Sequence, residues 1–425
     1  MIALTTAQII SIVIFLIVMI LIISEKVHRT TAALAGAVAL ILAGIISFDT
    51  GVSHIDFGTL GVLVGMMIFV AVVKNSGIFE YLAIRAAKIA KGNPWMIMVL
   101  FCLITAVLSA FLDNVTTVLL IGPVTFTVCK MLEISPVPFF IVEIIASNVG
   151  GTATLIGDPP NIMIGSATFF DFLMYDGPAV LLILAAAMVC FYFIYGRKMG
   201  VAEDKQASIM TLHAHEAIKS KSLFTKSVVM TVITAVAFVL HGAVHIEPSV
   251  VALAAAAIML ILSRAEVEEV LLDVEWSTIG FFAGLFVVVG GLAETGVIEM
   301  LANALIDATG GDLFLTIMIM VWASAIISSF LDNIPLVATL IPIVQTMEAA
   351  GLDVMPYWWA ISLGACIGGI GTLIGASANV VLSGMSKTYG YPITFMEYTK
   401  VAFPMMLVFT AISCVYLVLR FCVFV

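Results

Sequence analysis

Long apolar runs separated by short polar stretches cover most of the chain. Crossing a bilayer as a helix takes about 20 predominantly apolar residues. Runs of roughly this length occupy residues 6–23, 30–48, 57–73, 178–196, 227–245, 248–263, 276–292 and 402–422. Three further regions, 94–130, 138–170 and 312–385, are equally apolar but are interrupted by polar residues or by glycine and proline. Backbone groups cannot stay unpaired in lipid, so the interruptions predict re-entrant hairpins and broken helices that are buried in protein or line a watery cavity.

The interruptions occur in pairs. An LDN triplet at residues 112–114 returns at residues 331–333. GGTATLIGDPPN at residues 150–161 similarly matches GGIGTLIGASAN at residues 368–379. Each half therefore carries three spans, a hairpin, a broken span and a final span. Because five crossings is an odd number, the two halves are predicted to be inserted in opposite orientations, as in many secondary transporters.

The pattern thus predicts an all-α polytopic membrane protein made of two inverted repeats, with about ten transmembrane helices, two re-entrant hairpins and two broken helices. The first repeat covers residues 1–198, a linker follows at 199–226, and the second repeat covers 227–425. Within these repeats the predicted parts are scaffold spans at 1–92 and 227–311, a hairpin with a broken helix at 93–175 and 312–390, and closing spans at 176–198 and 400–422.

The composition supports this assignment. Of 425 residues, 63% are hydrophobic and 10% are charged, which excludes a soluble or nucleic-acid-binding domain. With the N-terminus outside, all 17 basic residues except Arg420 fall on one side, which the positive-inside rule identifies as the cytoplasm. Both termini are then outside the inner (plasma) membrane, the linker is cytoplasmic, and acidic residues such as Asp176 lie in outer loops. The six cysteines lie in apolar segments without CxxC spacing, so they are interpreted as small core residues, and no cofactor is predicted.

Carboxylates inside the apolar regions are the main candidates for function. An ionised aspartate at the bilayer centre costs roughly 2.5–3.5 kcal/mol on insertion scales, so packing alone does not account for Asp113, Asp158 and Asp332. Helix capping would explain Asn114 and Asn333, but it explains a buried carboxylate beside each of them less well. We expect these positions to bind an ion or a proton. Sodium is one candidate occupant of a site formed by Asp113, Asn114, Asp332 and Asn333.

Glu143 is a fourth intramembrane carboxylate, and the second half has no acidic counterpart for it. It is a possible proton site, with pairing to a polar neighbour as the alternative. No lysine or arginine lies deep in a predicted span. Such an interior favours cations, protons or uncharged hydroxylated solutes, and an anion would need bound cations or helix N-termini to receive it.

Two amphipathic segments, residues 77–92 and 296–311, are too short and too charged to span the membrane. Each is predicted to lie in the interface, one in each leaflet. They join scaffold spans to hairpins, so they are interpreted as hinged arms, with passive interfacial helices as the alternative. The candidate hinge points are Gly77, Gly92, Gly296 and Gly310.

With its paired LDN hairpins, SNVGGTATLIGDPPN and GGIGTLIGASAN, the chain resembles the ArsB/NhaD permease family of the ion transporter superfamily, in its P-protein-like branch. The resemblance implies a mobile transport domain that works as an elevator beside a scaffold that dimerises. The hairpin residues implied for the site are Asp113, Asn114, Thr116, Thr117, Asp332, Asn333 and Pro335. Those implied in the broken helices are Ser147, Asn148, Gly150, Thr152, Thr154, Asp158, Asn161, Thr372, Ser377 and Asn379.

These features predict a secondary active transporter of a small ion or solute, coupled to H⁺ or Na⁺, of the Na⁺/H⁺ exchange or arsenite/antimonite efflux type. The expected partners are the lipid bilayer and a second copy of the chain. Sodium-coupled transport of an organic anion such as citrate or a dicarboxylate, or of another anion, is the alternative. Related dicarboxylate carriers place Ser-Asn-Thr where this chain has Asp-Asn-Val and Asp-Asn-Ile. A passive channel and an intramembrane aspartyl protease are also considered; the YD and GxGD signatures of that protease are absent.

Overall fold

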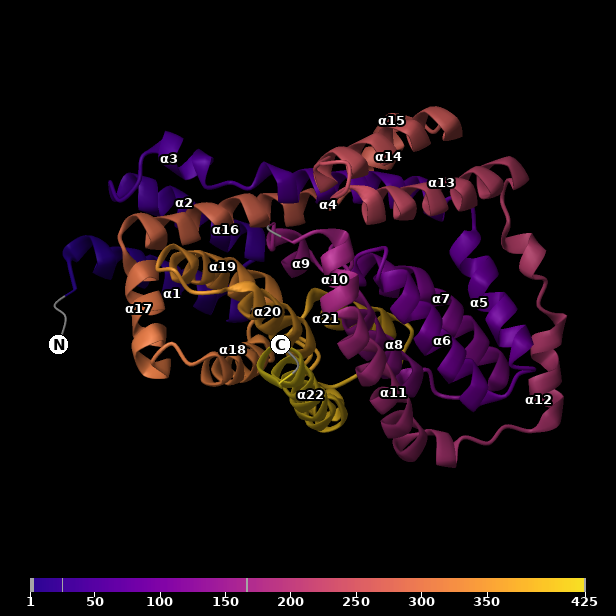
Figure 1. Cartoon of the computed structure of the whole chain (residues 1–425). Helices are drawn as coiled ribbons and strands as arrows, with labels where there is room; N and C mark the ends of the chain where they lie inside the picture. The colour runs from indigo at the N-terminus through magenta and orange to yellow at the C-terminus, as the bar shows by residue number, and fades with distance from the viewer. Residues whose placement is uncertain (1–3, 25, 166, 424–425) are drawn as a thin grey trace.

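The computed structural model describes residues 4–24, 26–165 and 167–423, and this part of the chain consists of helices and connections without a β-strand (Figure 1). The first half contains α1 (Thr6–Ser24), α2 (Arg29–Leu42), α3 (Phe48–Ser53), α4 (Phe57–Lys74), α5 (Ile78–Ile89), α6 (Pro94–Ser109), α7 (Asn114–Leu132), α8 (Val137–Gly151), α9 (Pro159–Met163), α10 (Phe169–Tyr175) and α11 (Gly177–Ile194). The second half contains α13 (Lys221–Leu240), α14 (Pro248–Ser263), α15 (Val267–Leu272), α16 (Trp276–Glu294), α17 (Val297–Thr309), α18 (Leu313–Ser328), α19 (Asn333–Ala349), α20 (Met355–Gly368), α21 (Ser377–Thr388) and α22 (Phe395–Val418). The predicted all-α class is confirmed.

The internal repeat covers more of the chain than the sequence motifs indicated. The short helices α3 and α15, which the hydrophobic pattern did not predict, are as long as each other and occupy equivalent places in the two halves. Helices α2 and α14 likewise correspond, one at the start of each half's second apolar run. The structural repeat therefore reaches back from the hairpins through the first spans of each half.

Packing between the halves comes in matched pairs. Helix α14 packs against α4, and the equivalent helices α2 and α16 pack against each other. The broken-helix segment α9 packs against α19, and its counterpart α21 packs against α7. Each of these contacts joins one half to the other. Such twinned contacts are what an approximate two-fold relation between the halves produces.

Glycines allow each hairpin to lie close to its broken helix. Helix α6 packs against α8, and α18 packs against α20. A Cβ atom on Gly150 would lie 2.1 Å from the carbonyl oxygen of Ala106, and one on Gly368 would lie 2.5 Å from that of Ala325. No larger residue fits at either contact, so these glycines permit close helix packing.

The two amphipathic segments form α5 and α17, which stand at opposite ends of the molecule and run across the direction of α4 and α16 (Figure 1). Each is flanked by glycines in the left-handed region, with φ values from 60° to 79° at Gly77, Gly92, Gly296 and Gly310. Left-handed backbone ends a helix sharply. The segments are thus separate helices at sharp bends, as expected for connecting arms, and their hinge role stays a prediction.

The boundary between the halves differs from the prediction. Helix α13 begins at Lys221, inside the predicted linker 199–226. The 3₁₀ turn η1 (Gly196–Lys198) precedes the linker, which itself contains α12 (Glu203–Ser208) and the 3₁₀ turns η2 (Ile209–Thr211) and η3 (Ala214–Ala217). The linker also docks on α5, where the Lys88 ammonium donates to the Leu212 carbonyl at 2.8 Å. Its polar composition had suggested a loop. Local hydrogen bonds and the contact with α5 instead give the linker a defined, partly helical structure.

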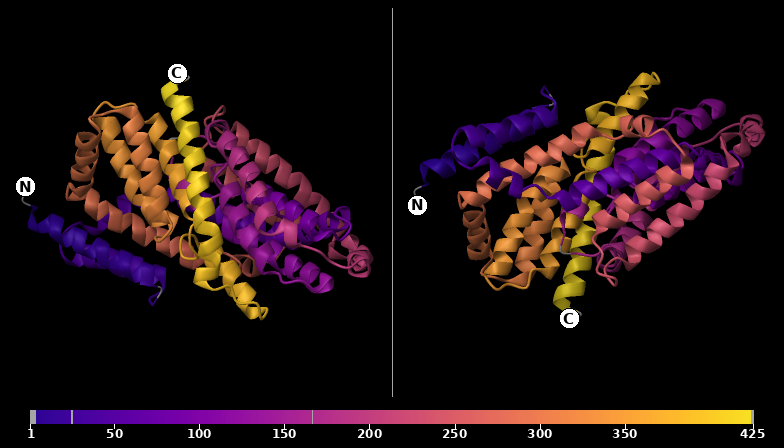
Figure 2. Two further views of the ribbon diagram at one scale, coloured as in Figure 1. Left: turned by 90° about the horizontal axis from the view of Figure 1, so that it is seen from below. Right: turned by 90° about the horizontal axis from the view of Figure 1, so that it is seen from above.

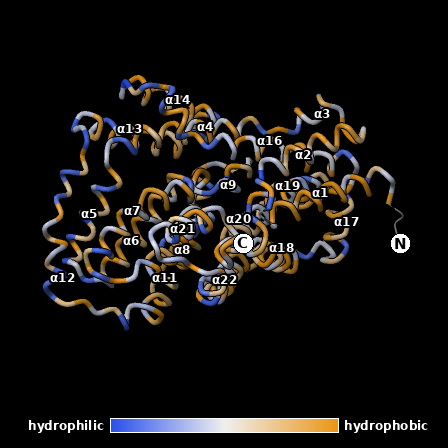
Figure 3. The backbone as a smooth tube through the Cα atoms, turned by 180° about the vertical axis from the view of Figure 1, so that it is seen from behind, coloured by the Kyte–Doolittle hydropathy of each residue, from blue (hydrophilic) through white to orange (hydrophobic). Residues whose placement is uncertain are grey.

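Seven helices in the described residues are long and apolar enough to cross a membrane, namely α1, α4, α7, α11, α13, α16 and α22. Helices α2, α6, α8, α14 and α18 are apolar but shorter. The predicted span 30–48 is an example, because α2 ends at Leu42 and the chain turns at Gly44, where φ is 69°. Hydrophobic residues run through these helices and hydrophilic ones gather at connections such as that around α12 (Figure 3). The protein is a multi-pass membrane protein, and the count of about ten spans stays a prediction.

Helix α22 runs through the middle of the molecule, between second-half and first-half helices (Figure 2). It packs against α18 and α20 on one side and α11 on the other, and it ends in a π-helical turn at Leu419–Val423. The cysteines of the described chain are free; four are buried and Cys190 is partly buried, whereas Cys422 in this last turn is exposed and is not a core residue.

Candidate functional site

The two hairpin tips are capped by their aspartates. Asp113 precedes α7, and its carboxylate accepts from the Thr116 backbone N–H at 2.8 Å and from the Thr116 hydroxyl at 2.5 Å. Asp332 precedes α19 and accepts from the Ile334 N–H at 3.1 Å. Capping, which had been considered as an alternative explanation for Asn114 and Asn333, is thus performed by the aspartates themselves. Asn114 and Asn333 are the first helical residues, while the aspartates hold the non-helical backbone conformation of an N-cap.

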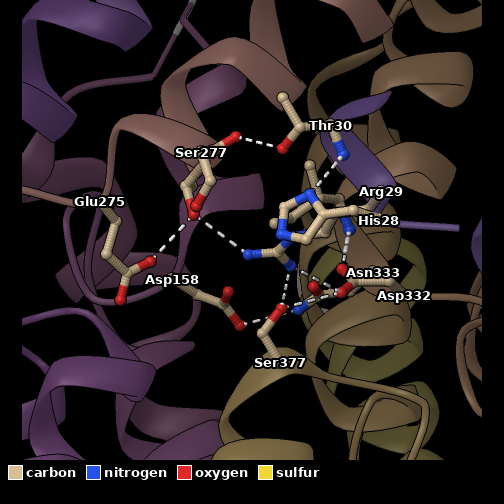
Figure 4. Close-up of polar contacts among 11 residues, drawn as sticks. His28, Arg29, Thr30, Asp158, Glu275, Ser277, Asp332, Asn333 and Ser377 are labelled. Atoms are coloured by element: carbon tan, nitrogen blue, oxygen red, sulfur yellow. Dashed lines mark hydrogen bonds and ion pairs between the residues drawn. The ribbon is translucent and has the colours of Figure 1, made fainter. Parts of the chain in front are cut away.

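Asp158 joins the two halves. It is fully buried before α9, but its side chain makes no capping bond there. Instead, Oδ2 accepts a hydrogen bond of 3.0 Å from the amide of Asn333 in the opposite hairpin tip (Figure 4). Its Oδ1 atom is buried and has no hydrogen-bond partner among the described residues. An unpaired buried carboxylate oxygen is costly unless something binds to it.

Both hairpin tips line one narrow pocket of about 20 Å³, which we call the carboxylate pocket. Its polar lining consists of Arg29, Asp113, Asn114, Asp158, Glu275, Thr278, Asn333 and Ser377. A space of roughly 10–15 Å³ holds one water molecule. The carboxylate pocket therefore has room for a proton, a water or a small bare cation, and it is too small for an organic solute.

Arg29 is the functional candidate that the sequence did not reveal. It is the first residue of α2, and its guanidinium donates to the hydroxyls of Ser377 and, at 3.1 Å, Thr278. It lies 3.6 Å from the Asp332 carboxylate (Figure 4). The charge pattern had assigned it to a cytoplasmic loop because it directly precedes an apolar run. The one signal in the sequence was asymmetry, since the second half has Pro248 at the equivalent helix start.

The contact between α2 and α16 holds Arg29 in place. The neighbouring Thr30 hydroxyl donates to the Ser277 carbonyl at 2.5 Å. The Thr278 hydroxyl, which accepts from Arg29, donates to Glu275 at 2.9 Å. The guanidinium also lies over the Phe281 ring, 5.3 Å from its centroid. The cation is thus fixed by α16 on one side and by the second hairpin and α21 on the other.

A larger cavity of about 270 Å³ adjoins the carboxylate pocket, and Arg29 and Ser377 line both. We call it the Arg29 cavity. Asp332 and His28 contribute its other polar groups, and isoleucine, valine and phenylalanine side chains form much of its wall. Helix α21 begins at this wall without a side-chain cap, so the positive end of its dipole faces the cavity together with Arg29. Its size approaches that of small-molecule sites.

Three predicted asparagines hold the unwound segments in place. The Asn161 amide donates to the carbonyls of Gly151, Thr152 and Thr154 at 2.9 to 3.3 Å. The Asn379 amide does the same for Gly369 and Thr372, both at 2.8 Å. Asn148 then links the halves by donating to Asn379 at 3.0 Å.

The hydroxyls of four other predicted residues donate to backbone carbonyls rather than facing the pocket; they are Ser147, Thr152, Thr154 and Thr372. Gly150 and Pro335 pack in the interior, Thr116 bonds to Asp113, and the buried Thr117 hydroxyl has no partner among the described residues. Of the predicted site residues, Asp113, Asn114, Asp158, Asn333 and Ser377 thus meet in the carboxylate pocket, and Asp332 faces Arg29. Their binding roles stay predictions.

Two further carboxylates are buried away from this pocket. Glu143 on α8 accepts from the Thr125 hydroxyl, which is the polar neighbour that the alternative interpretation required, and its second oxygen has no partner in the described chain. Asp176 was expected in an outer loop, but it is fully buried where α10 meets α11. It had been assigned to a loop because it directly precedes the apolar helix α11.

Repeated interrupted helices that meet at buried carboxylates are typical of membrane transporters. Residues 19–364 match the family described as citrate transporter (CitMHS), and the chain belongs to this family. It is 43% identical to the uncharacterized transporter Rv2684 of Mycobacterium tuberculosis, over 97% of this chain and 99% of that protein. It is 34% identical to the human P protein, over 93% of this chain but 58% of that protein.

The fold is similar to that of the solved YdaH transporter of Alcanivorax borkumensis, with a TM-score of 0.64 at 13% identity, covering 97% of this chain and 98% of that one. At this identity the likeness shows the fold alone. The similarity to the P protein agrees with the resemblance drawn from the motifs. The family that matches is that of citrate transporters, and membership of the ArsB/NhaD group stays a prediction.

Proposed function

We propose that this protein is a secondary active transporter whose coupling ion, H⁺ or Na⁺, binds in the carboxylate pocket at Asp158 and Asp113. The observation that carries the proposal is the buried Asp158 oxygen without a partner, in a carboxylate held by the opposite half of the molecule. Three carboxylates line this pocket and Arg29 is its one cation, so a positive charge is needed to balance them. Sodium also favours carboxylate and amide oxygens, which Asp113, Asn114 and Asp158 supply.

We further propose that the hairpins and broken helices move as one transport domain against a scaffold built from α1–α4 and α13–α16. The arms α5 and α17 would carry this elevator motion, and the scaffold would form a homodimer. The bends at both ends of each arm support this proposal.

An organic anion is the solute that the Arg29 cavity favours. A small organic carboxylate fits the cavity volume of about 270 Å³. Its negative charge would be bound by the Arg29 guanidinium and by the uncapped N-terminus of α21. The description of the family as citrate transporters points the same way. Sodium/proton exchange and arsenite or antimonite efflux remain the candidates if the solute is inorganic.

The proposal is tested with purified protein in liposomes that contain a pH-sensitive dye. Citrate, dicarboxylates, arsenite, Na⁺ and Li⁺ are offered in turn, with H⁺ and Na⁺ gradients imposed separately. A coupled carrier gives saturable uptake that depends on one of the two gradients. Flux that rises linearly with the solute gradient and ignores both ions would indicate a passive channel instead.

Asp158→Asn should lower the affinity for the coupling ion by between about tenfold and about hundredfold, because it removes the charge that binds the ion. Coupled uptake should fall accordingly while the variant still elutes as folded protein. Asp353→Asn is the matched control, since Asp353 is an exposed carboxylate that accepts from the Met355 backbone N–H at 3.2 Å before α20. Unchanged ion dependence in Asp158→Asn would remove Asp158 from the site.

A further inference from the structure

Asp176 is a fully buried carboxyl group outside the carboxylate pocket. Its Oδ2 atom lies 2.5 Å from the hydroxyl oxygen of Ser362 on α20. Its Oδ1 atom is buried without a hydrogen-bond partner in the described chain. None of the ion pairs recorded between described residues includes it. An ionised carboxylate in this position would therefore be held by a single hydroxyl.

The orientation of Asn161 is fixed by its surroundings. Its Nδ2 atom faces three carbonyl oxygens, so a flipped amide would place oxygen against oxygen. Its Oδ1 atom must then be the one that faces Ser362, at 3.1 Å, and the Cys366 thiol, at 3.4 Å. Oδ1 is an acceptor only, so Ser362 has to be the donor of that contact.

The contacts of the Ser362 hydroxyl differ between the two forms of Asp176 in the number of hydrogens available to them. The Ser362 hydroxyl has one hydrogen but stands between two acceptors, Asp176 Oδ2 and Asn161 Oδ1. If Asp176 is ionised, one of the two contacts has no hydrogen. If Asp176 carries a proton on Oδ2, it donates to Ser362 and Ser362 donates to Asn161. The protonated form alone satisfies both contacts.

Other charged and titratable groups near Asp176 do not replace that proton. They are Cys366 on α20 and, at the end of the chain, Tyr416 and Arg420. The Arg420 guanidinium donates to the Met174 carbonyl at 2.8 Å and to the Tyr416 hydroxyl at 2.7 Å. Tyr416 in turn donates to the Tyr175 carbonyl. Arg420 and Tyr416 thus bind the end of α10, and the Cys366 thiol faces Asn161, so their hydrogen bonds go to groups other than the Asp176 carboxyl.

We infer that Asp176 is a second proton-binding site, separate from the carboxylate pocket, and that its proton fixes α9 through Ser362 and Asn161. Asp158 directly precedes α9, so loss of the proton loosens the segment that carries the coupling-ion carboxylate. Deprotonation releases H⁺ to water and turns the Ser362 hydrogen toward Asp176. Asp176 acts as a positioning residue, and its effect on transport rests on the proposed function.

The proton itself is tested without transport, by infrared spectroscopy of the full chain in lipid at neutral pH. Wild type should show the carbonyl band of a protonated carboxyl group that Asp176→Asn lacks. Ser362→Ala keeps the carboxyl group but removes its acceptor, so it should shift that band. Asp353→Asn, which alters an exposed carboxylate, should leave it unchanged. A band equally strong in Asp176→Asn, or unshifted in Ser362→Ala, would overturn the inference.

The link to the coupling-ion site is tested in liposomes. Wild type should lose affinity for the coupling ion as the pH rises, whereas Asp176→Asn, whose amide donates to Ser362 permanently, should keep its KM over the same range. Asp176→Ala and Ser362→Ala should raise the KM about tenfold at all pH values. A pH profile of Asp176→Asn that matches wild type would refute the link. If wild type itself carried none of the solutes, the proposed function would fail while the infrared result would still decide the state of Asp176.

Discussion

At the scale of single residues, the site departs from the symmetry of the repeat. The equivalent of Asp158 in the second half is Ala376, and the equivalent of Arg29 is Pro248. One half therefore supplies the partly unpaired carboxylate and the cation, while the other supplies Asn333 and Ser377, which bind them. Two identical halves would form two equal sites. Because the second half has neither the carboxylate nor the arginine at the equivalent positions, the carboxylate pocket and the Arg29 cavity have no symmetric copy built from those residues.

Arg29→Gln should raise the KM for an anionic solute by between about tenfold and about hundredfold, because charge-assisted hydrogen bonds to the solute are lost. Arg29→Lys should recover part of the affinity, since an ammonium supplies the charge without the planar fork. Initial uptake rates measured against solute concentration give the KM. Lys26→Gln is the control, because Lys26 is an exposed cation three residues away. An unaltered KM in Arg29→Gln would exclude the Arg29 cavity as the binding site for an anion.

At the scale of elements, the broken helices depend on close packing as much as on polar groups. Asn161 and Asn379 satisfy the carbonyls that unwinding leaves free, which is the condition for irregular backbone inside a membrane. Gly150 and Gly368 let α8 and α20 approach their hairpins so closely that hydroxyls such as that of Ser328 reach across to a backbone carbonyl, at 2.6 Å from Ala365. Each hairpin and its broken helix thus form one tightly packed unit.

Gly368→Ala should lower the stability of the folded protein by about 1–3 kcal/mol, because the new methyl group overlaps the Ala325 backbone. Gly384→Ala offers a matched control in the next helix, since a Cβ atom there would have no neighbour within 4 Å. It should leave stability unchanged or raise it slightly. Thermal unfolding of both variants in detergent measures the difference. Equal midpoints would show that α18 and α20 tolerate a wider separation.

At the scale of the whole molecule, the twinned contacts divide the chain into two kinds of region. Helices α2, α4, α14 and α16 join the halves on one side, and α7, α9, α19 and α21 join them on the other. The carboxylate pocket lies where the two regions meet, because Leu63 and Met67 of α4 line it opposite the hairpin tips. A site at such a boundary can be exposed to either side of the membrane by relative movement of the regions.

Cross-linking Thr278→Cys on α16 to Ser377→Cys on α21, in a chain otherwise free of cysteine, should stop transport, and reduction should restore it. Both positions bond to Arg29 from opposite regions, so a short reducible linker can join them. The control pair is Phe126→Cys with Tyr389→Cys, whose native rings stack at 4.0 Å within the proposed transport domain. That link should not impair transport. Full activity of the cross-linked Thr278–Ser377 pair would contradict an elevator motion.

The sequence by itself determined the helical class, the repeat, the hairpins, the broken helices and the two arms. These features follow from constraints that act locally along the chain: the length of an apolar run, the need to bury any backbone that leaves the helix, and the amphipathic spacing of the arms. It also marked Asp113, Asn114, Asp158 and Asn333, because a polar residue in an apolar run stands out without knowledge of its neighbours.

The tertiary structure decided which of these residues meet and which others join them. Asn333 reaches Asp158 across 175 positions and Arg29 reaches Ser377 across 348, and nothing in either local stretch encodes the partner. Arg29 and Asp176 looked like loop residues because each stands at the end of an apolar helix. Only the packing of one half against the other brings the first against Asp332 and Ser377 and buries the second beside Ser362.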